Sequence, residues 1–211
     1  MIPWGMGNIL HLLLIGCMAF SSHRSINSNQ QQNQGDAQKA LVTTWLIDGN
    51  NLKCFRGVPD ERASIIQELE KIASPCHDTP LNDTHGDNKT KKITKISNVI
   101  LVFDGHHNET FQKTISPNSW FQYIITSGIN KEKDRADNYI IEEALPKLRD
   151  WDCNNHELGY VHLITADKEL SQRARATGVM NGGSIVYPPK FWKQYLPNLQ
   201  RTQKRNQDVQ K

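Results

Sequence analysis

This 211-residue sequence lacks the patterns that identify several common classes of protein. Its four cysteines include no C-x-x-C pair, which argues against a zinc ribbon or a thioredoxin-type redox site. No G-x-G-x-x-G follows the first predicted strand, which argues against a Rossmann nucleotide-binding domain. The formal net charge is only +3, so the charge permits a nucleic-acid partner without requiring one.

Residues 1–40 carry the features of a targeting segment. Residues 9–20, ILHLLLIGCMAF, form an apolar run of signal-peptide length that is short for a membrane span. Residues 21–40 are rich in Ser, Asn and Gln and resemble a transit peptide. A signal-like segment 1–20 followed by a transit-like segment 21–40 resembles the two-part plastid address of algae with complex plastids. We therefore expect a plastid protein without stable membrane insertion after processing, and secretion is the alternative.

Apolar runs alternate with helical patterns along residues 41–199. The predicted strands are 41–47, 98–105, 120–128, 160–168 and 183–192. The predicted helices are 60–73, 134–151 and 168–178. Alternation of this kind, with strands that are continuous apolar runs, is typical of a parallel sheet covered on both faces. The sequence therefore predicts one α/β domain, a three-layer α/β/α sandwich with a central, mainly parallel sheet.

Three further features of the domain follow from local composition. Pro146 should kink or shorten the helix that contains it. The polar stretch 74–95 is long for a compact domain and is expected to be a mobile loop. The polar segment 200–211 is expected to be a disordered tail.

Aspartates stand where the predicted strands end. Asp48, Asp104 and Asp167 each follow an apolar run, and the carboxyl ends of parallel strands meet at one edge of a sheet. Asp137 opens the helix after the third strand, and Asp134 lies about one turn before it, so both can share a helix face. The alternative for any one of them is a turn or a helix cap.

Carboxylates that converge in this way need a cation, because like charges repel and raise each other's pKa. Ligand sets made only of oxygen suit hard divalent ions, here Mg²⁺ or Mn²⁺. Such an ion activates water and neutralises the charge that develops on a phosphate during displacement. The pattern therefore predicts a divalent-metal site that can act on a phosphate group.

Four pieces of the sequence together resemble a YacP-like NYN domain of the PIN-like nuclease superfamily. In chain order they are LIDGNNL (46–52), VFDG (102–105), DRADNYIIEEA (134–144) and ITADKELSQRARATG (164–178). The resemblance covers most of residues 43–195 and implies a small α/β sandwich of PIN-like fold. It also implies a metal-dependent ribonuclease, since family members include ribonucleases that act on mRNA in association with ribosomes.

The resemblance assigns roles to particular residues. The acids Asp48, Asp104, Asp137 and Asp167 correspond to the catalytic, metal-binding cluster. Asp134 stands where the family often has Glu and is expected to be either an outer metal ligand or a residue that supports the ligands. Asn51 matches the family's Asn in its Asp-Gly-x-Asn turn, whereas Asn50 replaces a common aromatic and is expected to serve the turn alone.

An RNA substrate also needs cations around this edge of the sheet. With Asn51, the candidate substrate-binding residues are Lys53, Arg56, Lys131, Lys133, Arg135, Lys168, Arg173 and Arg175. The alternative for each cation is a solvated helix face. His106 and His107 are expected in a plain loop, and Tyr123, Tyr139 and Trp151 in the core rather than as platforms for bases.

The sequence leaves two functions from different classes open. The first is a Mg²⁺- or Mn²⁺-dependent ribonuclease, either endo- or exonucleolytic, whose RNA substrates include ribosome-associated mRNA or rRNA as candidates. The second is a catalytically silent RNA- or ribosome-binding module on the same fold. A haloacid-dehalogenase phosphatase is disfavoured, because its general acid would be an Asp at position 50, where this chain has Asn50.

Overall fold

The computed structural model describes residues 40–75, 95–117, 119–129, 133–150, 156–180 and 182–208. The expected targeting segment up to residue 39 lies outside the described residues, as do most of the loop 74–95, Lys131 and Trp151.

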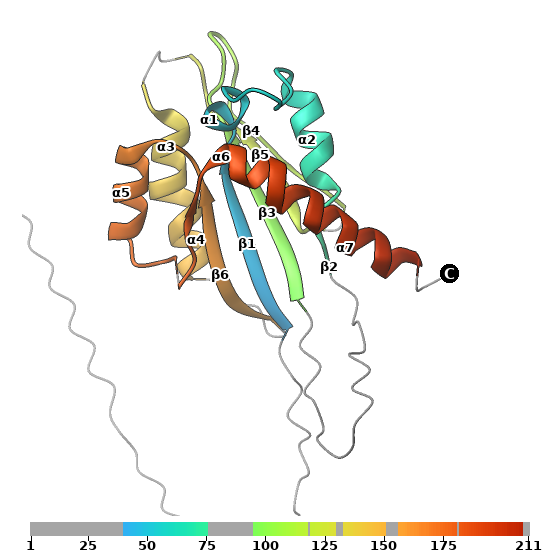
Figure 1. Cartoon of the computed structure of the whole chain (residues 1–211). Coiled ribbons are helices and arrows are strands. Elements are labelled where there is room, and N and C mark those ends of the chain that lie inside the picture. Colours follow the sequence, from blue (N-terminus) through green and yellow to red (C-terminus); the bar gives the residue numbers. More distant parts are fainter. Residues whose placement is uncertain are drawn as a thin grey trace, which may run out of the picture. The chain divides into compact units, whose positions relative to one another are not determined.

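The described strands form one seven-stranded sheet (Figure 1). They are β1 (Ala40–Asp48), β2 (Ser74–Pro75), β3 (Lys95–Phe103), β4 (Gln112–Ile115), β5 (Phe121–Ile125), β6 (His156–Ile164) and β7 (Ile185–Val186). The order is β4-β5-β3-β1-β6-β7, with β2 paired to β3. The β1–β3, β1–β6, β3–β5 and β6–β7 pairs are parallel, and only β2 and β4 are antiparallel to their partners. The predicted α/β fold with a mainly parallel sheet is confirmed.

Alternate residues of the central strands feed two separate cores. Trp45 and Ile47 of β1 pack into one core, whereas Leu46 between them packs into the other. On β3, Phe103 belongs to the first core and Val102 to the second. Because successive side chains of a strand point to opposite faces, a continuous apolar run buries both faces of the sheet.

Helices cover both faces. They are α1 (Gly49–Lys53), α2 (Arg62–Glu70), α3 (Arg135–Tyr139), η1 (Ile140–Ala144), α4 (Leu145–Arg149), α5 (Lys168–Ala176), α6 (Pro188–Lys190), η2 (Phe191–Tyr195) and α7 (Leu196–Asp208). The first core takes residues from α1, α2, η2 and α7, and the second from α3, η1, α4 and α5 (Figure 1). None of the helices in the described ranges is long and apolar enough to cross a membrane.

Two wide helical turns precede Leu-Pro pairs. η1 ends just before Leu145-Pro146, and η2 ends just before Leu196-Pro197. In both, the N–H of the leucine bonds the carbonyl five residues back, from Leu145 to Ile140 and from Leu196 to Phe191. Proline has no N–H to donate to the carbonyl four residues back, and its ring would clash with that carbonyl. The wider turn before each proline avoids this clash. The helix is therefore not shortened at Pro146 and continues to Arg149.

Two expectations about the C-terminal part are wrong. The predicted strand 183–192 ends at Val186, because Pro188 opens helix α6 in the first-turn position that proline favours. The segment expected to be disordered from residue 200 is helical to Asp208. Gln203 is buried there, and its amide donates to the carbonyl of Ile72 at 3.4 Å, so packing against the end of α2 holds this polar helix in place.

Candidate functional site

The acids predicted at strand ends do share one edge of the sheet. Asp48 is the last residue of β1, Asp104 follows the end of β3, and Asp167 comes shortly after β6. The three strands are adjacent and parallel, with Asp48 opposite Val102 of β3 and Ile47 opposite Ile164 of β6. The carboxyl edge of the sheet therefore brings three aspartates from distant parts of the chain to one place.

Asp48 is the most buried of these acids, with 4% of its surface exposed. Its Oδ1 accepts from the backbone N–H of Asn51 at 3.0 Å, and its Oδ2 accepts from Oγ1 of Thr165 at 3.0 Å. Burial raises the pKa of Asp48 to about 6, against the two hydrogen bonds that lower it. The charges of Asp104 and Asp167 also contribute to this rise, so both acids act electrostatically on Asp48.

Asp104 ties three elements together. Its Oδ1 accepts from the backbone N–H of Ala136 in α3 at 2.7 Å, and its Oδ2 accepts from the side-chain amide of Asn50 at 2.6 Å. Thr126, after β5, donates to Oδ1 at 3.5 Å. Asn50, which the sequence assigned to the turn alone, therefore orients a carboxylate of the cluster.

Asp167 combines the two roles that the sequence left as alternatives. It caps α5, with its Oδ1 accepting from the backbone N–H of Leu170 at 2.9 Å. It also contributes to the raised pKa of both Asp48 and Asp137, so it belongs to the acid cluster as well.

Asp137 lies in the first turn of α3 and is half-buried, and its carboxylate makes no hydrogen bond or ion pair with any described residue. Its pKa is raised to about 7, first by burial and then by the charges of Asp48, Asp167, Asp134 and Asp104, in that order. This carboxylate therefore faces the other acids without a compensating partner among the described residues.

Asp134 is the outermost of the five acids. It stands exposed at the N-cap of α3 with a left-handed φ of 55°, and its side chain makes no capping hydrogen bond. Its charge contributes to the raised pKa of Asp137, which agrees with a place at the margin of the cluster. The acid cluster is defined from here on as Asp48, Asp104, Asp134, Asp137 and Asp167.

The fit of the acid cluster to a divalent cation depends on donor chemistry and on geometry. Its donors are all carboxylate oxygens, the type that Mg²⁺ and Mn²⁺ prefer. Within the described residues, however, no three His, Cys, Asp or Glu side chains stand close enough to hold a metal ion directly. Hydrogen bonds already hold both oxygens of Asp48 and of Asp104. Direct ligation by three carboxylates would require side chains to move, whereas a shell completed by water would not.

The predicted substrate-binding residues fall into two groups. Three of them already have protein partners. Oδ1 of Asn51 accepts from the backbone N–H of Ala166 at 2.9 Å. Arg135 donates to the carbonyl of Gly105, and Arg173 donates to the side-chain oxygen of Asn138, both at 2.8 Å. These three therefore brace the edge of the sheet. Among the described residues, no partner forms a hydrogen bond or ion pair with the side chains of Lys53, Arg56, Lys133 or Lys168.

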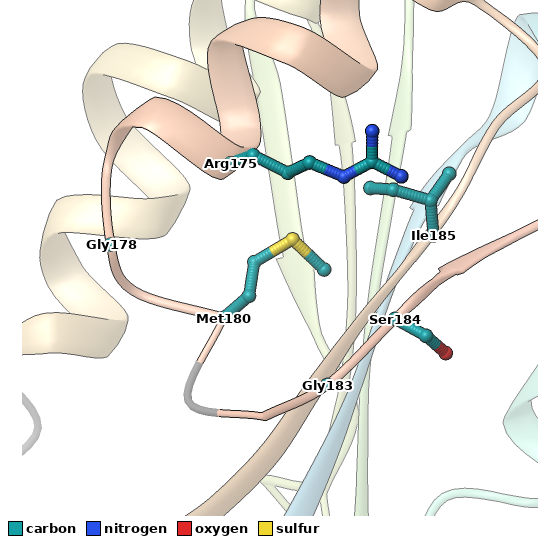
Figure 2. A pocket seen from close by; sticks show the side chains of 6 residues that line it. All are labelled: Arg175, Gly178, Met180, Gly183, Ser184 and Ile185. Atoms are coloured by element: carbon teal, nitrogen blue, oxygen red, sulfur yellow. The ribbon is translucent and has the colours of Figure 1, made fainter.

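Arg175 does not belong with the other cations. It lies in the last turn of α5, eight residues after Asp167 (175 − 167), or about 12 Å along the helix. There it lines a separate cavity of about 350 Å³ with Met180 and Ile185 (Figure 2).

Sequence reasoning missed an arginine that supports Asp104. Arg62 of α2 donates to the backbone carbonyl of Asp104 and, at 2.9 Å, to the carboxylate of Glu109. Glu109 in turn accepts from the backbone N–H of His106. The ion pair of Arg62 and Glu109 therefore holds the backbone at Asp104 and at His106. In the sequence Arg62 is only one charge among several on an amphipathic helix, and no local signal points to this contact.

Gly105 follows Asp104 in a tightly packed turn. A Cβ at this position would lie 2.0 Å from the carbonyl oxygen of Thr126 and 2.9 Å from the backbone nitrogen of Gly128. Because both neighbours are backbone atoms, only glycine permits this approach. The glycine in the Asp-Gly pair therefore serves the packing of the β3 and β5 ends.

Comparison with protein-family models, with curated proteins and with solved structures gave no match for this chain. The resemblance to YacP-like NYN domains thus depends on the four sequence pieces alone.

Proposed function

We propose that this protein is a Mg²⁺- or Mn²⁺-dependent ribonuclease with a YacP-like NYN domain of PIN-like fold. The observation that carries the proposal is the carboxylate of Asp137, half-buried among Asp48, Asp104 and Asp167 without a partner among the described residues. A cluster of like charges in a partly buried site is costly unless a cation neutralises it. A divalent ion is the partner that fits this set of oxygens.

Asp137 would be the first ligand, with Asp48, Asp104 and Asp167 around it and Asp134 at the margin. Since Mg²⁺ keeps several waters and takes only one or two carboxylates directly, the acids can hold it without all contacting it. The ion would supply an activated water and charge neutralisation for phosphodiester hydrolysis. The protein's share is to hold the carboxylates rigidly, which strands β1 and β3 and the cap of α5 do.

RNA as the substrate is supported by the cations near the same edge. Lys53 and Arg56 follow β1, Lys133 precedes α3, and Lys168 opens α5. These four side chains make no hydrogen bond or ion pair in the described part of the chain, so they remain available to phosphates. They offset the negative charge of the acid cluster along a path that a strand of RNA can follow.

The catalytically silent RNA- or ribosome-binding module is supported by a different observation. Protein donors hold both oxygens of Asp48 and of Asp104. In that case the acids would serve as caps and braces of the sheet edge, and the cations alone would contact RNA.

Cleavage by the purified full chain distinguishes the two functions. The substrates are single-stranded and structured RNAs, each incubated with Mg²⁺, Mn²⁺ or EDTA, beside Asp104→Asn and Asp137→Asn variants. The ribonuclease is expected to cut only with metal, and both variants are expected to lose cutting. RNA that is bound but not cut would support the binding module, and RNA that is neither bound nor cut would overturn both proposals.

A further inference from the structure

A cavity of about 280 Å³ opens beside the acid cluster. Its wall comes from Phe111 before β4, from Thr126 and Ser127 after β5, and from α3 and η1. Because Gln112 of β4 pairs with Ile125 of β5, Phe111 and Thr126 lie at the same edge of the sheet as the acids. The cavity is thus part of the carboxyl edge, where ligands bind in parallel α/β folds.

The cavity and the acid cluster share walls. Thr126 lines the cavity and lies 3.5 Å from Oδ1 of Asp104, and Arg135 lines it with its Nε 4.0 Å from the same oxygen. Asn138, another lining residue, directly follows Asp137 in α3. A group held in this cavity is therefore next to the carboxylates that would hold the metal.

Two aromatic rings form the apolar part of the wall. The ring centroids of Phe111 and Tyr139 are 6.0 Å apart, with an angle of 40° between the ring planes. Phe111 is 51% exposed, which leaves much of its surface free to contact a ligand. Tyr139, expected in the core, packs against the second core and also lines the cavity. Aromatic rings of this kind stack against any nucleic-acid base that is not already stacked.

The charged side chains of the wall are Arg135, Glu142 and Glu143, so carboxylates outnumber the one cation. Glu143 is paired with Lys147 at 2.5 Å, whereas Glu142 is exposed and its carboxylate has no hydrogen bond or ion pair among the described residues. Carboxylates repel a phosphate, but they accept hydrogen bonds from the amino group of a base. The wall therefore suits a base, and the phosphate of the same nucleotide would lie toward Arg135 and toward the metal ion proposed at the acid cluster.

We infer that this cavity binds an unpaired, amino-bearing base of the RNA substrate, with the base stacked on Phe111 and its amino group directed to Glu142. The inference rests on the proposed ribonuclease function and extends it to the substrate. Adenine, cytosine and guanine carry an exocyclic amino group and uracil does not, so uracil is disfavoured. Paired bases are excluded because both of their faces are covered by neighbours in the duplex.

Fluorescence of 2-aminopurine tests the stacking without any cleavage. Single-stranded RNA that carries 2-aminopurine is titrated with the full chain in EDTA, and stacking on Phe111 is expected to quench the emission. Phe111→Ala is expected to abolish the quenching and to weaken binding about tenfold, within the range found for base–aromatic stacking. Phe111→Leu keeps an apolar side chain and is expected to lose the quenching too. Tyr160→Ala removes another aromatic side chain with 51% exposure and is expected to change neither.

Substitution of Glu142 tests the choice of base. Glu142→Gln removes a charge-assisted hydrogen bond to the amino group, so the affinities for oligo(A) and oligo(U) are expected to come within about twofold of each other. The quenching that depends on Phe111 is expected to persist in this variant. An unchanged preference for oligo(A) over oligo(U) would overturn the role of Glu142.

The results separate this inference from the ribonuclease proposal. Quenching that depends on Phe111, in a protein that cuts no RNA with metal, would support the base site and overturn the nuclease. Metal-dependent cutting in a protein whose quenching survives Phe111→Ala would overturn the base site alone. Absence of RNA binding would overturn both.

Discussion

The side-chain amide of Asn50 donates a 2.6 Å hydrogen bond to Oδ2 of Asp104, which joins the turn after β1 to the turn after β3. The next residue makes the same kind of link on the other side: Oδ1 of Asn51 accepts from the backbone N–H of Ala166, after β6. Two successive amides after Asp48 therefore brace the ends of both neighbouring strands. This explains why an apolar strand ends in Asp-Gly-Asn-Asn.

Substitution of Asn50 should loosen Asp104. Asn50→Ala is expected to lower the rate of metal-dependent cleavage about 10- to 100-fold, the usual effect of removing a residue that orients a metal ligand. The free energy of unfolding should fall by only about 1 kcal/mol, the net contribution of one hydrogen bond. Rates and denaturation midpoints measure the two effects. Asn198→Ala on the exposed side of α7 is the matched control, and a wild-type rate in Asn50→Ala would contradict the bracing role.

Asp137→Asn should stabilise the metal-free protein at high pH. The pKa of Asp137 is raised from 3.8 to about 7, first by burial and then by the four neighbouring acids, so the folded chain holds a proton that the unfolded chain releases. The free energy of unfolding therefore falls as pH rises from about 4 to about 7. Because Asp137 is half-exposed, solvent screens part of this effect. Asp137→Asn should therefore raise the free energy of unfolding by about 1 to 2 kcal/mol at about pH 8.

Urea denaturation in EDTA at about pH 4 and at about pH 8 measures this effect. Wild type and Asp137→Asn should agree at the lower pH, where Asp137 is protonated in both the folded and, increasingly, the unfolded chain. Asp60→Asn, an exposed carboxylate near α2, serves as the control. A large loss of stability in Asp137→Asn at about pH 8 would show that the charged carboxylate supports the fold.

Divalent ions should stabilise the wild-type chain against unfolding and should not stabilise Asp137→Asn. A ligand at a hundred times its dissociation constant adds about 2.7 kcal/mol to the free energy of unfolding. Thermal unfolding with Mg²⁺, Mn²⁺ or EDTA should show this gain at about pH 8 and a smaller gain at about pH 5, where protons compete for Asp137. Equal gains in wild type and in Asp137→Asn would contradict a metal site at the acid cluster.

The salt dependence of RNA binding should locate the phosphate path. Lys133→Gln and Lys168→Gln are each expected to reduce the slope of log affinity against log salt by about 0.7, the value for one phosphate contact with a single strand. Lys204→Gln, an exposed lysine of α7, should leave the slope unchanged. Slopes that fall equally in all three variants would indicate a diffuse charge effect without a defined path.

Local patterns were sufficient to predict the layers of the fold and the acids at the edge of the sheet. A buried parallel strand must be apolar on both faces, so its end shows in the sequence as the first polar residue, as at Asp48 and Asp104. The polar helix after Leu196 could not be predicted in this way, because its order comes from contacts such as that of Gln203 with Ile72.

The order of strands and acids along the chain was enough to predict which carboxylates meet, since parallel strands bring their carboxyl ends to one edge whatever their separation in sequence. How each carboxylate is held depends on the folded chain: Asp104 by Asn50, Ala136 and Arg62, Asp167 as the cap of α5, and Asp137 by no described residue. The meeting of Phe111 and Tyr139 beside the acids is likewise a product of tertiary packing. Side-chain contacts between distant segments have no periodic signature, because they depend on packing in three dimensions and not on neighbours in the chain.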